Sequence, residues 1–262
     1  MARNRRSGVS RFPPADFRGT QLDWMRIAAA TVIAAAAIYW WPRPADPLPG
    51  LPHVFLWAWE QPEDLRFLDP HFAGIAFLDR TVFLDRGSIS VRPRLQPLRF
   101  SAGTALMAVV RVEPRALPLP DAGATADAIA KAAHGPGIGA LQVDFDAARS
   151  QRTFYRQVLT DLRSRLPREM PLSMTALASW CESDNWIEGL PVAEAVPMLF
   201  RMGAGERPAL RFRPELCRSS VGVSTDTPLP APPPAGRLYI FNPRPWSRAD
   251  FDSAIHEVHR WH

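Results

Sequence analysis

The chain has 262 residues, of which 47% are hydrophobic and nine are tryptophan, so it can bury the core of one large domain or two small ones. Its formal net charge of +5 first suggests an acidic partner such as a nucleic acid. The first 26 residues hold six arginines and two aspartates, however, so the remainder is almost neutral. This distribution argues against a broad phosphate-binding surface, and we expect no nucleic-acid partner.

The N-terminal region has the pattern of an uncleaved signal anchor. After Arg26 comes "IAAATVIAAAAIYWW", a run without charge that Pro42 closes. Residues 24–41 are just long enough to span a bilayer, and their terminal aromatic residues suit an interface better than a cleavage site. The arginines of residues 1–23 predict a cytoplasmic tail, a single pass through the inner membrane and a body in the periplasm. An alanine-rich soluble helix is the alternative.

A proline-rich stretch, "WPRPADPLPGLP", follows the predicted anchor. Residues 42–52 are expected to form a stiff, extended linker because proline restricts the backbone. The remaining residues, 53–262, are expected to form one domain.

Short apolar runs recur through that domain and predict eight strands. Several are apolar on both faces, which is typical of strands that are covered on both sides of a parallel sheet. The predicted strands are 53–60, 74–79, 105–114, 139–147, 171–180, 194–202, 220–225 and 237–246.

Helical patterns fall between some of these strands, at 125–134, 150–166 and 247–261, the last with Ser247 as a candidate N-cap. Residues 81–94 predict a hairpin that turns at Arg86–Gly87, and the proline-rich residues 226–236 predict a loop. Eight strands with intervening helices favour an α/β fold, a compact, partly degenerate (β/α)8 TIM-type barrel after the anchor helix. A doubly wound open sheet is the alternative, although no glycine-rich phosphate loop accompanies it.

The strand "GALQVDFD" (139–146) carries the main candidate site. Side chains alternate across a strand, so Gln142, Asp144 and Asp146 share one face and the apolar residues share the other. In a barrel the polar face points into the lumen, where the two carboxylates, with Cβ atoms roughly 6.5–7 Å apart, would titrate as a coupled pair.

Further polar and aromatic residues lie near the predicted strand ends, where barrels place their active sites. Aromatic faces stack on sugar rings, and carboxylates bind hydroxyls or protonate a glycosidic oxygen. Besides Gln142, the candidate ligand-binding residues are Trp57, Trp59, Glu60, Trp180, Arg201, Asn242, Arg244 and Trp246. Glu113 is a reserve carboxylate for catalysis.

Structural explanations for these residues stay open. The two aspartates could instead belong to a buried ion-pair network with Arg111, Arg201 or Arg244, or the strand could be half exposed. Trp57 and Trp59 could be packing residues. The six histidines form no H-x-x-x-H pair, so we expect neither a metal nor another cofactor.

"GALQVDFD" resembles the fourth-strand motif of chitinase-like glycoside hydrolase barrels, in which acidic residues alternate and the last is a glutamate. The resemblance gives Gln142, Asp144 and Asp146 the three alternating positions, and Trp246 that of a tryptophan at the end of strand eight. Two departures are that Gln142 replaces an acid and Asp146 replaces the catalytic glutamate.

The blocks "LQVDFDA", "PLSMTALASWC", "AVPMLFRMG" and "FNPRPW" are also similar to the signature blocks of a bacterial family known only as a domain of unknown function, over roughly residues 53–246. That resemblance implies no established activity.

The sequence therefore supports two hypotheses. In the first, a membrane-anchored, periplasm-facing barrel binds or hydrolyses a glycan, with Asp146 as the acid and Asp144 as its electrostatic partner. In the second, the barrel is a non-catalytic carbohydrate-binding or scaffold module of a cell-envelope complex, as the missing glutamate suggests.

Cys181 and Cys217 would be exported with the domain, where isolated pairs often form disulfides. The predicted strands place Cys181 at the C-terminal face of the barrel and Cys217 at the opposite face. Bridged cysteines need Cα atoms within about 7 Å. Either the strand boundaries are displaced or the thiols are free.

Overall fold

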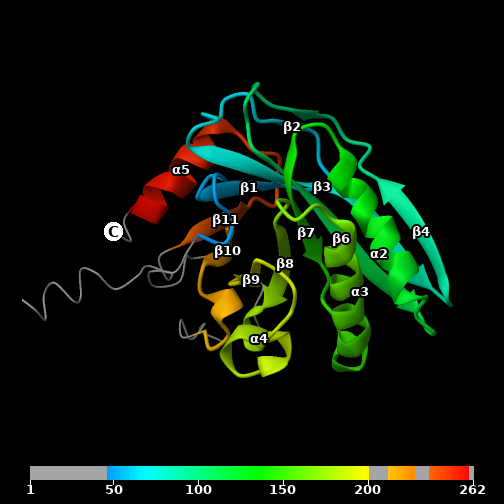
Figure 1. The fold of residues 1–262 in the computed structure, drawn as a ribbon. Helices are drawn as coiled ribbons and strands as arrows, with labels where there is room; N and C mark the ends of the chain where they lie inside the picture. The colour runs from blue at the N-terminus through cyan, green and yellow to red at the C-terminus, as the bar shows by residue number, and fades with distance from the viewer. Residues whose placement is uncertain (1–45, 201–211, 228–235, 260–262) are drawn as a thin grey trace, which may run out of the picture. The chain divides into compact units, whose positions relative to one another are not determined.

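The computed structural model describes residues 46–200, 212–227 and 236–259 (Figure 1). The predicted tail (1–23) and anchor (24–41), like Arg201, lie outside these ranges. Within them, no helix combines the length and the apolar character needed to cross a membrane.

Within the described residues, eight parallel strands form a closed barrel in which each barrel strand pairs with the next one along the chain and the last pairs with the first. This topology is consistent with the predicted TIM-type barrel and excludes the open sheet. The barrel strands are β1 (Val54–Ala58), β3 (Ala73–Asp85), β6 (Leu106–Ala116), β7 (Ile138–Asp144), β8 (Leu172–Leu177), β9 (Glu194–Met198), β10 (Ser220–Ser224) and β11 (Arg237–Phe241).

The helices of the described chain are unevenly distributed around the barrel. The two that connect β6 to β7 and β7 to β8, α2 (Ala122–Ala130) and α3 (Arg152–Arg165), lie together outside the strands (Figure 1). The other elements are β2 (Glu63–Asp64), β4 (Ser88–Pro93), β5 (Leu98–Arg99), η1 (Lys131–His134), η2 (Arg149–Gln151), α4 (Ala178–Glu182), η3 (Asn185–Ile187), η4 (Glu215–Cys217) and α5 (Arg248–His259).

The hairpin predicted for residues 81–94 is present, but it is not separate from the preceding strand. β3 continues to Asp85 and then pairs with β4 in antiparallel register. Arg86 and Gly87 at the turn have φ angles of 46° and 79°, a conformation that a two-residue hairpin turn requires. The apolar run extends the strand because Val82 and Leu84 still pack in the core outside the barrel.

Ser247 caps the last helix as predicted. Its hydroxyl accepts a hydrogen bond from the Asp250 amide, at 3.1 Å, and the Asp250 carboxylate accepts one from the Ser247 amide, at 3.2 Å. These reciprocal bonds satisfy amides that the first turn leaves unpaired.

Two hydrophobic cores confirm the alternation predicted for β7. Leu141, Val143 and Phe145 pack in the core between strands and helices. Gln142 and Asp144 instead lie on the lumen side, beside a smaller core that fills the barrel. The polar face of "GALQVDFD" therefore lies inside the barrel.

Residues 46–52, predicted as part of a stiff, extended linker, pack against the N-terminal end of the barrel. Leu48 is fully buried in the inner core. The Arg237 side chain donates hydrogen bonds to the carbonyls of Leu48 and Pro52 and to the Asp46 carboxylate. The packed domain thus includes residues 46–52, because this arginine ties that segment to β11.

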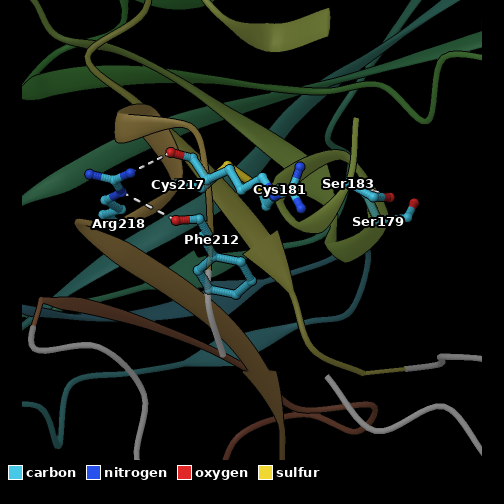
Figure 2. The surroundings of a disulfide bond; sticks show 7 residues. Ser179, Cys181, Ser183, Phe212, Cys217 and Arg218 are labelled. Atoms are coloured by element: carbon cyan, nitrogen blue, oxygen red, sulfur yellow. Dashed lines mark hydrogen bonds between the residues drawn. A yellow bond between two sulfur atoms is a disulfide. The ribbon is translucent and has the colours of Figure 1, made fainter. Parts of the chain in front are cut away.

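Cys181 and Cys217 form a disulfide, with Cα atoms 5.9 Å apart (Figure 2). The strand expected to end at Trp180 ends at Leu177, and α4 begins at once on the outside of the barrel. Its Cys181 carbonyl accepts a hydrogen bond from the Arg213 amide, two residues before η4 begins. Because β8 ends earlier than predicted, α4 and the segment before β10 come together. Of the two alternatives, displaced strand boundaries and free thiols, the first is therefore correct.

Candidate functional site

A cavity of about 230 Å³ opens at the C-terminal ends of the barrel strands. Its lining comes from β1, β6, β7, β8, β9 and β11 or from residues directly after them, because parallel strands in a barrel end at the same face. The lining residues are Trp57, Trp59, Val109, Arg111, Asp144, Asp146, Thr175, Leu177, Met198, Phe200 and Phe241.

The two aspartates lie on the same side of this cavity. Asp144 is half-buried at the end of β7 and accepts a hydrogen bond from the Thr175 hydroxyl at 2.8 Å. Burial and the neighbouring Asp146 charge raise the pKa of Asp144 to about 6, against the opposing effects of Thr175 and Arg111. Asp146 is more exposed, and partial desolvation raises its pKa while Arg111 opposes the change.

Arg111 is the cation that contributes to the described lining, yet it does not seal the carboxylates. Its guanidinium lies 3.8 Å from the Glu113 carboxylate and 5.8 Å from the centre of the Trp59 ring. Among residues 46–200, 212–227 and 236–259, neither Asp144 nor Asp146 forms an ion pair. The described residues therefore leave both carboxylates available to a ligand.

Aromatic rings form much of the remaining wall. Phe200 and Phe241 stack with ring centres 5.8 Å apart and an angle of 8° between their planes. Trp57 meets Phe200 edge-on at 6.1 Å and forms a buried part of the wall. The cavity thus combines flat apolar surfaces with a carboxylate pair, an arrangement suited to a ligand that has both apolar faces and hydroxyl groups.

Gln142 does not line the cavity. It is fully buried, accepts a hydrogen bond from the Trp57 indole at 2.9 Å and donates one to Ser173 at 3.1 Å. Its amide therefore orients a cavity residue and does not contact a ligand from its place in the barrel.

Three other candidates pack elsewhere. Trp180 belongs to the short helix α4 and packs edge-on against Trp186 outside the barrel. Trp246 also lies in the outer core, where its indole donates to the Trp57 carbonyl at 3.1 Å. Asn242 is buried and accepts a hydrogen bond from Thr225.

The remaining predicted residues lie outside the cavity. Glu60 is paired with Arg92 on the surface, and Glu113, two residues beyond Arg111 on β6, is half-buried beside it. Arg244 lines a different, smaller pocket between the last strands and α5. The candidates that the cavity does bring together are Trp57, Trp59, Asp144 and Asp146.

Several lining residues are not among the binding residues that the sequence predicts, namely Thr175, Leu177, Phe200 and Phe241. The alternation along β8 places Thr175 and Leu177 on one face, and Phe241 is the last residue of β11. This pattern could have identified Thr175, Leu177 and Phe241, but only with correct strand boundaries.

The fold and the cavity together define a closed parallel barrel with paired carboxylates and aromatic residues at the C-terminal ends of its strands. No group of three or more potential ligands for a metal occurs in the part of the chain that the structure describes.

Residues 102–198 match a family described as "Domain of unknown function (DUF3142)". The resemblance to a domain of unknown function is therefore confirmed over this part of the chain, which includes β6 to β9 and both cavity aspartates. Comparisons with curated proteins and with solved structures give no match.

Proposed function

We propose that this barrel binds or hydrolyses a glycan, and that the cavity at the C-terminal ends of its strands is the site. The observation that carries the proposal is the position of Asp144 and Asp146 in a cavity with stacked aromatic rings. Sugar rings have apolar faces that stack on aromatic planes and hydroxyls that carboxylates bind. The 230 Å³ volume is below the roughly 300–1,000 Å³ of pockets for drug-sized ligands, which favours one sugar ring over a longer segment.

For hydrolysis, the electrostatics favour Asp144 over Asp146 as the proton donor. The carboxyl with the pKa of about 6 keeps its proton at a higher pH. It would donate this proton to the glycosidic oxygen as the bond to the anomeric carbon breaks. The Asp146 carboxylate would face the positive charge that develops on that carbon, and water would add there and release a proton. This assignment reverses the roles suggested by the motif.

Asparagine variants of the two aspartates test the catalytic proposal. Asp144→Asn and Asp146→Asn should each reduce hydrolysis of any glycan that the protein cleaves by at least a hundredfold, the lower range for a lost acid or base. Asp252→Asn, on an exposed position of α5, is the matched control. Unchanged turnover in either cavity variant would remove that residue from the mechanism.

The second candidate function is a non-catalytic carbohydrate-binding or scaffold module of a cell-envelope complex. It is favoured by the use of Gln142 to hold Trp57 and by an aspartate at position 146 where chitinase-like barrels have a glutamate. Binding on a glycan array without product would support the binding module. Absence of binding, together with co-purifying envelope proteins, would support the scaffold.

We also propose that residues 24–41 anchor the protein in the inner membrane, with the barrel in the periplasm. The support is the charge-free run after an arginine-rich segment, together with the disulfide, which is typical of an oxidising compartment. Deleting residues 1–41 should move the protein from the membrane fraction to the soluble fraction of cells. Persistence in the membrane fraction would contradict the anchor.

A further inference from the structure

We propose that Glu194 is a positioning residue for the cavity: it fixes the orientation of the Trp57 ring without contacting a ligand. The importance of that ring for a glycan rests on the proposed function, whereas the positioning itself does not. The proposal depends on two separate lines of contacts that run from Trp57 and end on the same oxygen atom.

The first line is a chain of hydrogen bonds across the barrel lumen. The Trp57 indole donates to Gln142, and Gln142 donates to the Ser173 hydroxyl. That hydroxyl donates in turn to Oε1 of Glu194, at 3.1 Å. All four side chains are buried, and buried polar groups bond to one another because water does not reach them.

The second line is a stacking contact. The Tyr239 ring stacks against Trp57 with ring centres 5.5 Å apart and an angle of 27° between their planes. The Tyr239 hydroxyl donates a hydrogen bond to the same Oε1 atom of Glu194. Glu194 therefore holds both the hydrogen-bonding partner and the stacking partner of Trp57.

The position of Glu194 in the barrel supports this role. Its side chain is fully buried, and it lies on β9 below the cavity without lining it. The guanidinium of Arg237 is 3.9 Å from its second oxygen and is itself fixed to the Asp46 carboxylate and to backbone carbonyls. A buried carboxylate that accepts two hydrogen bonds and faces an arginine is costly to rearrange, so the network specifies one arrangement of the ring.

The positioning has a consequence for ligand recognition. Because its indole N–H is bonded to Gln142 inside the barrel, Trp57 presents only ring carbons to the cavity. A ligand that contacts Trp57 therefore meets an apolar surface there, and its hydroxyls are expected to face Asp144 and Asp146 in the same cavity.

The indole signal of Trp57 in a nitrogen–proton NMR spectrum tests the inference without any ligand. Trp57→Phe assigns the signal by removing it. Glu194→Gln and Ser173→Ala should move this signal upfield in the proton dimension and speed its hydrogen exchange by about tenfold, the effect of losing roughly one hydrogen bond. Glu188→Gln, at an exposed position, is the control.

Ser173→Ala keeps the test decisive if Glu194→Gln does not fold, because it removes only one hydroxyl from the chain of bonds. If both folded variants leave the Trp57 signal within the range of the control, Glu194 does not position the ring. If the variants shift the Trp57 signal but the protein binds no glycan, the positioning role is supported and the proposed function is contradicted. Failure of the positioning role can therefore be distinguished from failure of the proposed function.

Discussion

At the scale of single residues, the carboxylate of Asp144 is the least favourably placed charge in the cavity. Its pKa rises from 3.8 to about 6, chiefly because of burial and then because of the Asp146 charge. The folded protein therefore binds more protons than the unfolded chain between about pH 4 and pH 6, and this residue makes stability fall as the pH rises through that range. The destabilisation that the raised pKa of Asp144 causes is fully present above pH 6.

Replacing Asp144 by asparagine should remove that cost. Asp144→Asn is expected to match the wild type near pH 4 and to be more stable above pH 6, by at most about 3 kcal/mol for a shift of this size. Urea denaturation at pH 4, 5, 6 and 7.5 measures the difference. A variant that is less stable than the wild type at pH 7.5 would contradict the assignment of a raised pKa.

The same shift predicts the pH dependence of any hydrolysis. If protonated Asp144 is the acid, the turnover rate should fall as the pH rises above about 6, because the proton is lost from the free enzyme. A rate that increases steadily to pH 8 would be inconsistent with this role. The pH profile of kcat/KM on a cleaved glycan provides the measurement.

At the scale of elements, close packing of strands inside the barrel depends on a glycine in β10. A Cβ atom on Gly222 would lie 2.8 Å from Cη2 of Trp57, closer than carbon atoms approach. The lumen has room for the tryptophan ring because this strand has no side chain at that level.

Gly222→Ala should destabilise the protein by about 1–3 kcal/mol, the usual cost of overpacking, and should displace the Trp57 ring. Gly139→Ala on β7 is the matched control, since its Cβ would lie 3.3 Å from the end of the Leu51 side chain and 3.7 Å from the Leu106 carbonyl oxygen, with no ring in the way. Thermal or urea denaturation of both variants gives the comparison. Equal stability of Gly222→Ala and the wild type would show that the ring moves aside freely.

At the scale of the whole domain, the disulfide joins two crossover segments of the barrel. It links α4, after β8, to η4, before β10, across 36 residues of sequence. Figure 2 shows that Arg218 donates to the Phe212 carbonyl near the bridge, so both the covalent bond and hydrogen bonds secure this crossover. The bridge constrains the unfolded chain more than it constrains the native barrel.

The double variant Cys181→Ala/Cys217→Ala should therefore lower the free energy of unfolding by roughly 3–4 kcal/mol, as expected for a loop of this length. Ser183→Ala, at an exposed neighbouring position, serves as the control. Urea denaturation with and without reductant is the measurement. A wild type whose stability is unaffected by reductant would indicate that the bridge contributes little.

Local sequence patterns are sufficient to predict the number and order of the barrel strands and the two faces of β7. Hydrophobic runs of strand length recur along the chain, and alternation within "GALQVDFD" separates Leu141, Val143 and Phe145 from Gln142 and Asp144. Both signals are local in the chain, so they need no knowledge of distant contacts.

Which residues at the strand ends share the cavity, and what Gln142 does, depends on the closed three-dimensional fold. Ending β8 at Leu177 moves Trp180 to a helix outside the barrel and brings Cys181 to Cys217. Strand ends, crossover paths and the closing of the barrel depend on pairings between residues far apart in sequence, and a shift of a few residues changes which side chains meet. The carboxylates could be found from the sequence, whereas the aromatic wall and the Glu194 network needed the closed barrel.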